Sequence, residues 1–431
     1  MLALVFVVLL TAIVVEFSFD AQVDASLAIA RDSYFEAYVA AKSAVAEGMA
    51  LLAADLLDSI GGAQQQVQES TRLVPPGEYD SFFDGVPWAE GAPLKPMNDA
   101  MMRTSIDDEY GKINLNALLI MDENGELREN DWLVLALRFF FKERDPELGY
   151  DPVDAILDWL DHGDGEEERP DGAEGDYYEG LEIPYPCKNG PMDAVEELLL
   201  IQGITPELYY GKPEDIREAE EDEDIPPVLP LSEYLTVHGD WQGKVNPNTA
   251  EYETLLAVLT GYAEANPDIA NYDPMTAVEC LFEPFYQEMP LTDLSEADRC
   301  VQVQTTRRNQ RTQNRTNNRV NNPPRTDNQQ LFNAGEKQAR RDGGGDAQPD
   351  DGANQAGADP GQNQVFDDAP GAATMFRVNS MAFRIRGDGM MNDTLVRIEA
   401  FVWRTPSDPG MIQGGGGTAD PFRILDWKVI Q

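Results

Sequence analysis

Carboxylates crowd into one short stretch of the sequence, DWLDHGDGEEERPDGAEGDYY, residues 158–178. So many like charges repel one another unless a cation neutralises them. Calcium binds about six to eight oxygens in flexible geometry, and the glycines of this stretch allow it to wrap such an ion. The stretch differs from an EF-hand loop, because with Asp161 as position 1 the third and fifth positions are Gly163 and Gly165. The crowded carboxylates are Asp161, Asp164, Glu166, Glu167, Glu168, Asp171, Glu174 and Asp176.

Two other interpretations of residues 158–178 stay open. A solvated acidic loop that binds no ion has the same pattern. Paired carboxylates also serve hydrolases, but no flanking nucleophile or second histidine accompanies them, so we expect no catalytic residue and no enzyme. The chain has only two histidines, His162 and His238, which argues against a histidine-rich zinc site.

The charge balance also restricts the partners. Asp and Glu outnumber Lys and Arg by 78 to 32, for a net charge of -46, which argues against a nucleic-acid partner. Residues 302–373 are rich in Asn, Gln, Gly and Arg and contain few large apolar side chains. Burial could not offset the cost of ordering such a segment, so we expect it to be disordered and dispensable for folding.

The N-terminal residues predict a membrane span. Residues 1–15 carry no charge, and extending the apolar part past Glu16 to Phe19 gives a helix of about 28 Å, enough to cross a bilayer once. An apolar stripe spaced three or four residues apart continues from Leu27 to Leu56, and the first strong stop is Gly61-Gly62. We therefore expect one helix of about 57–60 residues. The alternatives are an uncleaved signal anchor, or a membrane span followed by an unrelated first helix.

The rest of the chain divides by periodicity. Residues 61–103 are expected to form an extended connection, and residues 104–119 a short strand with a turn at Gly111. Helical periods follow up to residue 300, including a helix that starts at Asp151-Pro152 and another capped by Asn248 or Thr249. The C-terminal segment alternates as strands joined by a loop GDGMMND, which need the early strand and the long helix as partners.

Three cysteines are too few for a disulfide scaffold. Cys280 and Cys300 could pair in an oxidising compartment, which would leave Cys187 free.

The order of these parts resembles the GspK family, the large minor pseudopilin of bacterial type II secretion. The motifs that carry the resemblance are spread over nearly the whole chain outside residues 302–373. They are LALVFVVLLTAIVVEFSFDAQVD, ARDSYFEAYVAAKSAV, DEYGKINLNAL, ILDWLDHGDGEEERPDGAEGDYY, NGPMDAVEELLLIQGITPELY, KVNPNTAEYETLLAVL and FRIRGDG followed by TLVRIEAFVWR.

The resemblance implies an α+β fold in which a pilin-like long N-terminal helix packs on a small antiparallel sheet and carries a large, mainly α-helical inserted domain. The implied division of the chain is a membrane and stalk helix (1–60), a first part of the pilin-like domain (61–119), an inserted helical domain with the acidic loop (120–301), the low-complexity tract (302–373) and the C-terminal strands (374–431).

The resemblance also implies a function and a site. The protein would cap or initiate the pseudopilus at its tip, bound to minor pseudopilins I and J and near H, for export of folded proteins across the outer membrane. Its residues 1–19 would lie in the inner membrane and its head in the periplasm, after a prepilin peptidase removes a short basic leader that ends close to the present start. The implied calcium ligands are Asp161, Asp164, Glu174 and Asp176, with Glu166 and Asp171 as second choices.

Two alternatives remain beside this interpretation. One is a minor pilin of a type IV pilus or a DNA-uptake system. The other is a membrane-tethered, calcium-dependent binding protein that acts alone.

Overall fold

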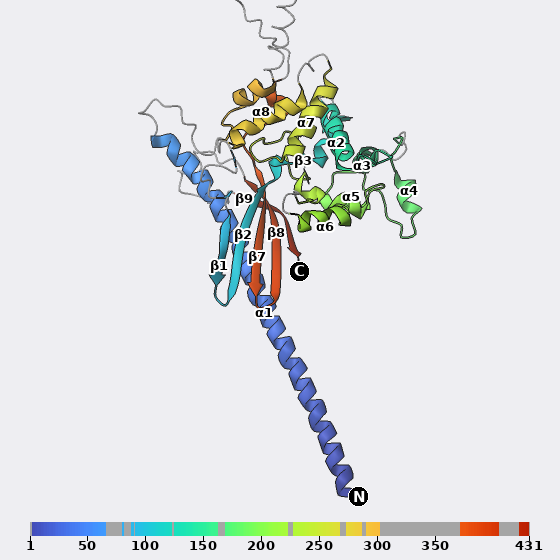
Figure 1. The fold of residues 1–431 in the computed structure, drawn as a ribbon, viewed down its shortest axis with the longest axis vertical. Coiled ribbons are helices and arrows are strands. Elements are labelled where there is room, and N and C mark those ends of the chain that lie inside the picture. The colour runs from blue at the N-terminus through green and yellow to red at the C-terminus, as the bar shows by residue number, and fades with distance from the viewer. Residues whose placement is uncertain are drawn as a thin grey trace, which may run out of the picture.

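The computed structural model shows a long helix, an antiparallel sheet packed on that helix, and a helical unit beside the sheet (Figure 1). It describes residues 2–65, 80–81, 88–89, 91–122, 125–162, 169–222, 227–267, 273–286, 290–301, 371–404 and 422–430. This arrangement confirms the fold class expected from the sequence.

The sheet has five antiparallel strands in the order β1-β2-β7-β8-β9. Strand β2 comes before the helical unit and β7 after it, yet the two pair in register, with Ile106 opposite Ile385. The expected dependence of the C-terminal strands on the early strand is therefore confirmed. The strands are β1 (Ala92–Met97), β2 (Ala100–Asp108), β7 (Ala382–Met391), β8 (Thr394–Arg404) and β9 (Phe422–Ile430).

Helix α1 (Leu2–Gln65) has 64 residues, about 96 Å at 1.5 Å per residue, and it continues through Glu16 without interruption. It is the one helix in the described part of the chain that is long and apolar enough to cross a membrane. The expected stop at Gly61-Gly62 is wrong, because glycine weakens a helix by only about 1 kcal/mol and Ala63, Gln64 and Gln65 continue it.

The expected apolar stripe on α1 is buried in one part of the helix and exposed in another. Ala41, Val45 and Leu52 are fully buried against the chain's own sheet. Leu27 and Tyr34, nearer to the N-terminus, are exposed together with Phe35. This N-terminal part of the stripe therefore offers exposed apolar surface that another molecule could contact.

Two glycines let the sheet approach α1 very closely. A Cβ on Gly387 would lie 2.3 Å from the carbonyl oxygen of Ala41, and one on Gly389 would lie 1.9 Å from that of Ala37. Both glycines lie in strand β7, so GDGMMND is not the hairpin loop that its glycines suggested. The turn is only Asn392-Asp393, where Asn392 has a φ of 52°, and Gly387 and Gly389 serve a close helix contact instead.

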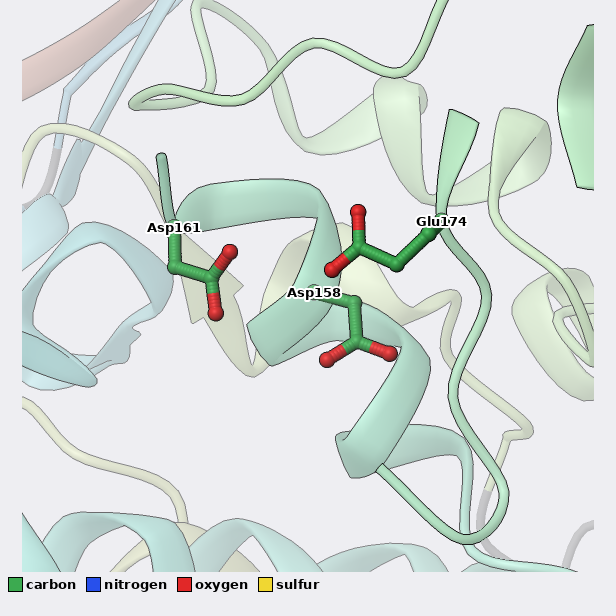
Figure 2. A group of neighbouring side chains, drawn as sticks. All are labelled: Asp158, Asp161 and Glu174. Atoms are coloured by element: carbon green, nitrogen blue, oxygen red, sulfur yellow. The ribbon is translucent and has the colours of Figure 1, made fainter. Parts of the chain in front are cut away.

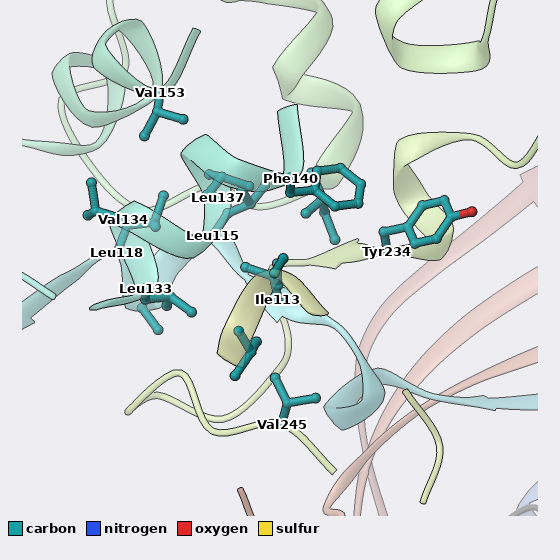
Figure 3. Packing of buried hydrophobic residues seen from close by; sticks show 14 of the residues in the cluster. Ile113, Leu115, Leu118, Leu133, Val134, Leu137, Phe140, Val153, Tyr234 and Val245 are labelled. Carbon is teal, nitrogen blue, oxygen red and sulfur yellow. The ribbon is translucent and has the colours of Figure 1, made fainter. Parts of the chain in front are cut away.

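The helical unit encloses the larger of the two main hydrophobic cores, part of which is drawn in Figure 3. Phe140, Leu137 and Leu133 of α2 point into it, and Ile113 of the short strand β3 meets them from the opposite side. The helices are α2 (Asp131–Arg144), α3 (Pro152–Leu160), α4 (Gly175–Glu179), α5 (Pro206–Tyr210), α6 (Pro213–Glu221), α7 (Tyr252–Ala265) and α8 (Pro274–Tyr286). Short strand pairs are β3 (Ile113–Asn114) with β6 (Leu235–Thr236), and β4 (Leu119–Met121) with β5 (Leu127–Glu129).

The predicted start of α3 is confirmed, since Asp151 accepts a hydrogen bond from the Val153 N–H and Pro152 is the first helical residue. The predicted cap of α7 is wrong, because the helix begins only at Tyr252. Asn248 instead holds the backbone of Leu291 through two hydrogen bonds.

Two further expectations change at the edges of the described segments. Residues 61–103 include strand β1 and the start of β2, so this stretch is not only a connection. Residues 302–370 lie outside the described residues, but Ala372 is fully buried in the larger core and its N–H donates to Asp298.

Cys280 and Cys300 form a disulfide, and Cys187 is free.

Candidate metal centre

Three carboxylates from two neighbouring elements converge beside the end of α3, as Figure 2 shows. Asp158 lies in the last turn of α3, and Asp161 is the residue that directly follows the helix. Glu174 is the residue that precedes α4 and comes from the far end of the acidic loop. One oxygen from each of the three side chains lies within 4.8 Å of the others.

Arg169 provides a positive charge within this group. Its Nη1 lies 2.5 Å from Asp158 Oδ1 and 2.8 Å from Asp161 Oδ2, and its Nη2 lies 3.0 Å from Glu129 Oε1. The guanidinium therefore neutralises part of the repulsion between the carboxylates and ties the end of the acidic loop to α3.

Asp158 is the most buried member of the group, with a fully buried side chain. Burial raises the pKa of this carboxyl above its usual range, against the opposing effect of Arg169. Its Oδ2 has no hydrogen-bond partner among the described residues. A buried carboxylate oxygen left in this way is costly, and a bound cation would satisfy it.

The backbone around Asp158 leaves space only for a glycine. A Cβ on Gly172 would lie 1.8 Å from Asp158 Oδ2. The loop thus brings its main chain close to the carboxylates, which is the arrangement that a wrapping cation loop requires.

The structure brings together only part of the ligand set expected from the sequence. Asp161 and Glu174 lie in the carboxylate group. Asp171 instead accepts a hydrogen bond from the Asp151 N–H, and Asp176 is exposed in the first turn of α4. Asp164 and Glu166 lie outside the described residues.

Asp158 was missed by the sequence reasoning. It stands between Leu157 and Trp159, in a segment that was predicted only to be a helix. The spacing of three residues to Asp161 within a predicted helix was the signal that could have identified it. All three side chains offer carboxylate oxygens, which favour a hard cation such as Ca²⁺ over a transition metal.

A second buried polar group, here called the junction network, joins α1, the sheet and the helical unit. Arg404 at the end of β8 lies 2.9 Å from Asp55 of α1 and 2.6 Å from Asp80. Asp108 at the end of β2 accepts hydrogen bonds from Ser380 at 2.5 Å and from Thr249 at 2.6 Å. Burial raises the pKa of Asp108 to about 6, although these hydroxyl groups oppose the shift.

Comparisons with known proteins concern the segment that holds the carboxylate group. Residues 111–211 match the family model described as type II secretion system (T2SS), protein K. A curated relative, type II secretion system protein K of Aeromonas hydrophila, is 33% identical over 132 residues, which are 29% of this chain and 39% of the relative. The chain thus matches about two fifths of that relative's length, and the resemblance to the protein K family is confirmed.

A solved structure is also similar. It is described as the crystal structure of the GspK-GspI-GspJ complex from the type 2 secretion system of enterotoxigenic Escherichia coli. The match covers 94% of this chain and 99% of the solved chain, with 13% identity and a TM-score of 0.49.

Proposed function

We propose that this chain acts as protein K of a type II secretion system, a non-enzymatic minor pseudopilin that caps or initiates the pseudopilus for export of folded proteins. The observation that carries the proposal is the protein K match over residues 111–211. This segment forms much of the helical unit, and the unit is mounted on a single long helix and a five-stranded sheet.

The position of the helical unit supports a place at the end of a filament. It lies beside the end of the sheet that is far from the N-terminus of α1 (Figure 1). A bulky unit at that end would block the addition of another subunit above it, whereas the free N-terminal half of α1 can pack below among similar helices. Minor pseudopilins I and J are the partners that we propose for that half, with H nearby in the same filament.

The membrane anchor is proposed to be residues 1–19, with the head in the periplasm after a prepilin peptidase has processed the precursor. The apolar side chains from Phe6 to Phe19 are exposed, as is expected of a helix surface that faces lipid. The disulfide between Cys280 and Cys300 fits an oxidising compartment such as the periplasm.

The interaction with sister helices can be tested by co-purification of the full-length, tagged chain from cross-linked membranes. We expect two pilin-like chains to be recovered with it. Phe35→Glu, at a side chain 60% exposed on α1, is expected to reduce their recovery at least tenfold. Ile183→Glu, at an exposed side chain on the helical unit, is the matched control and should leave recovery unchanged.

Failure to recover any pilin-type chain would contradict the proposed function. Recovery that is equally strong for Phe35→Glu would instead contradict only the proposed contact surface. Secretion of a reporter exoprotein, measured in the same strains, should fall in parallel with the recovery.

We further propose that the carboxylate group binds Ca²⁺ through Asp158, Asp161 and Glu174. Calcium would supply two positive charges, which neutralise the carboxylates and fix the acidic loop. Arg169 already occupies Asp158 Oδ1 and Asp161 Oδ2, so the cation would bind mainly at Asp158 Oδ2 and Glu174 or displace the guanidinium.

Thermal unfolding of the full chain in detergent tests the calcium site. At a free Ca²⁺ concentration of 100 times Kd the stabilisation is about 2.7 kcal/mol, which raises the Tm of a chain of this length by roughly 3–4 °C. Asp158→Asn combined with Asp161→Asn should remove this calcium-dependent shift, whereas Glu179→Gln, at an exposed residue of α4, should retain it. A shift that persists in the double variant would exclude these ligands. Asp176→Asn decides separately whether Asp176 is also a ligand.

A further inference from the structure

Helix α1 carries a single charged side chain inside the proposed membrane anchor, Glu16. Apolar side chains precede and follow it, since Val15, Phe17 and Phe19 are between 64% and 75% exposed on the helix surface. An ionised carboxylate in lipid is costly, and charged residues in membrane spans almost always face other helices and pair with an opposite charge. Contact with lipid therefore explains the apolar side chains of the anchor but leaves Glu16 unexplained.

The chain itself supplies no counter-charge for Glu16. Its carboxylate makes no hydrogen bond or ion pair with any residue that the structure describes. The first Lys or Arg of the sequence is Arg31, which lies about 22 Å further along the helix at 1.5 Å per residue. The N-terminal part of α1 extends away from the sheet and from the helical unit (Figure 1), so neither of them approaches Glu16. A counter-charge must therefore come from another molecule.

Glu16 lies on the face of α1 that packs against the sheet further along the helix. Residues seven apart lie on nearly the same side of an α-helix, because two turns take about 7.2 residues. Steps of seven residues from Glu16 lead to Val23, Ala30, Ala37 and Ala44. Ala37 and Ala44 are fully buried within the chain. The packing face of α1 thus continues past the end of the sheet and reaches Glu16, but no part of the described chain covers it there.

The surface beside Glu16 is shaped to receive a neighbouring helix. It forms a shallow hollow, lined by Val8, Thr11, Ala12, Val15, Glu16 and Phe19. Small side chains such as Thr11 and Ala12 allow helices to approach closely in a membrane. The Thr11 hydroxyl donates to main-chain carbonyl oxygens of its own helix, at 3.0 Å from Val7 and 2.8 Å from Val8. The Glu16 carboxylate is thus the charged group that this hollow offers to a partner.

We propose that Glu16 pairs with a Lys or Arg side chain of a membrane helix from a different polypeptide, which packs along this face of α1. The inference rests on the membrane anchor proposed above and adds a required chemistry to the partner. An entirely apolar helix would leave the carboxylate unpaired. A second, parallel copy of this chain would bring another Glu16 to the same depth, where the two like charges repel.

A single charge pair in an apolar interface would also fix how the two helices align. A shift of the partner by one helical turn moves its cation about 5.4 Å along the axis, away from the carboxylate. Isolated polar residues in otherwise apolar helix interfaces set register in this way. Glu16 would therefore select both the partner helix and its position relative to α1.

A synthetic membrane peptide tests the pair with the full-length chain in phosphatidylcholine vesicles at neutral pH. The probe is a labelled helix of about 22 Leu and Ala residues with one Lys at the depth of Glu16. The reference peptide has Leu in place of that Lys. Binding is measured by energy transfer to an acceptor at the N-terminus of the chain. We expect the Lys peptide to bind at least fivefold more tightly than the reference peptide.

Three variants connect this preference to Glu16. Glu16→Leu should abolish the preference, although it makes the anchor more apolar. Asp32→Leu removes an exposed carboxylate about 160° around the same helix and should retain the preference. Glu16→Lys should reverse it, so that a peptide with Glu in place of Lys binds more tightly. Equal binding of the Lys and reference peptides to the native chain, or a preference that survives Glu16→Leu, would overturn the proposal.

The peptide experiment can fail independently of the proposed function. A chain that recovers pilin-type partners from membranes but does not distinguish the two peptides loses only the charge pair. A chain that prefers the Lys peptide but recovers no pilin-type partner keeps the charge pair and loses the proposed function. A peptide preference that is equally strong in Glu16→Leu and Asp32→Leu would assign the selectivity to another part of the chain and overturn the proposal.

Discussion

Substitution of Gly389 by alanine should separate α1 from the sheet. The added Cβ would lie 1.9 Å from the carbonyl oxygen of Ala37, 2.5 Å from the Ala41 nitrogen and 2.9 Å from the Ala37 carbonyl carbon. All three atoms belong to the helix backbone, so no side chain can rotate away to make room. The helix must move outward by about 1.5 Å to reach an ordinary van der Waals separation of roughly 3.4 Å.

The movement would loosen a tightly buried contact. Ala37, Ala41 and Val45 of α1 are fully buried against residues of β7 and β8 such as Ile385 and Val396. Overpacking of a core typically costs about 1–3 kcal/mol, and a clash with backbone belongs at the upper end of that range. We therefore expect a loss of about 3 kcal/mol and a decrease in Tm of roughly 3–4 °C for a chain of this length.

Thermal unfolding of the full chain in detergent measures this effect. Gly149→Ala is the matched control, because nothing lies within 4 Å of a Cβ at that position, and its effect should stay within about 0.5 kcal/mol. Alanine is favoured over glycine inside a strand by about 0.5–1 kcal/mol when no clash occurs. A Gly389→Ala variant as stable as the native chain, or more stable, would therefore refute the close packing of α1 on β7.

Three further predictions concern buried charge, protonation and the disulfide. Arg404→Gln should lower the unfolding free energy by about 3–5 kcal/mol in denaturant titrations, because it leaves Asp55 and Asp80 buried without their cation, while Arg217→Gln at an exposed ion pair should change it little. A loss for Arg404→Gln no larger than for Arg217→Gln would contradict the burial of the network. The pKa of Asp108 is raised to about 6 in the folded state, whereas the unfolded state releases this proton near pH 4. This residue therefore contributes roughly 3 kcal/mol of stability below pH 4, and that contribution is lost as the pH rises to and through 6. Asp108→Asn should flatten that part of the stability profile between about pH 4 and 6.5, and an unchanged profile would argue against it. Cys300→Ser should lower the unfolding free energy by about 3 kcal/mol, and Cys187→Ser should not; equal effects would contradict the disulfide.

The long helix and the sheet were predicted well from the sequence, because these elements are long and strongly patterned. The apolar start and the stripe after Leu27 indicated one helix, and alternation in the last strands indicated a sheet that needs distant partners. The errors arose where one residue type serves two physical purposes. Gly387 and Gly389 are residues typical of a turn in the sequence, but in the structure they lie within strand β7 and let the strand pack closely on the backbone of α1.

The candidate site was predicted only in part for a similar reason. The carboxylates of the glycine-rich stretch were evident from charge alone, and of the proposed ligands Asp161 and Glu174 lie in the carboxylate group. Asp158 was hidden by its apolar neighbours, because periodicity in a short helix cannot show which polar residue faces a loop that returns later in the chain. The junction network could not be predicted, since Asp55, Asp108 and Arg404 belong to three separated segments whose meeting depends on the tertiary fold.

The pairing of β2 with β7 has a consequence for how the protein is made. The ribosome completes β2 at Asp108, but β7 begins only at Ala382, after roughly tens of seconds of further synthesis. During this interval α1 has already emerged, while most of the sheet that covers it does not yet exist. The nascent chain must therefore keep the alanine-rich face of the helix soluble or shielded until strands β7, β8 and β9 have been translated, so the formation of these strands completes the sheet that covers the helix.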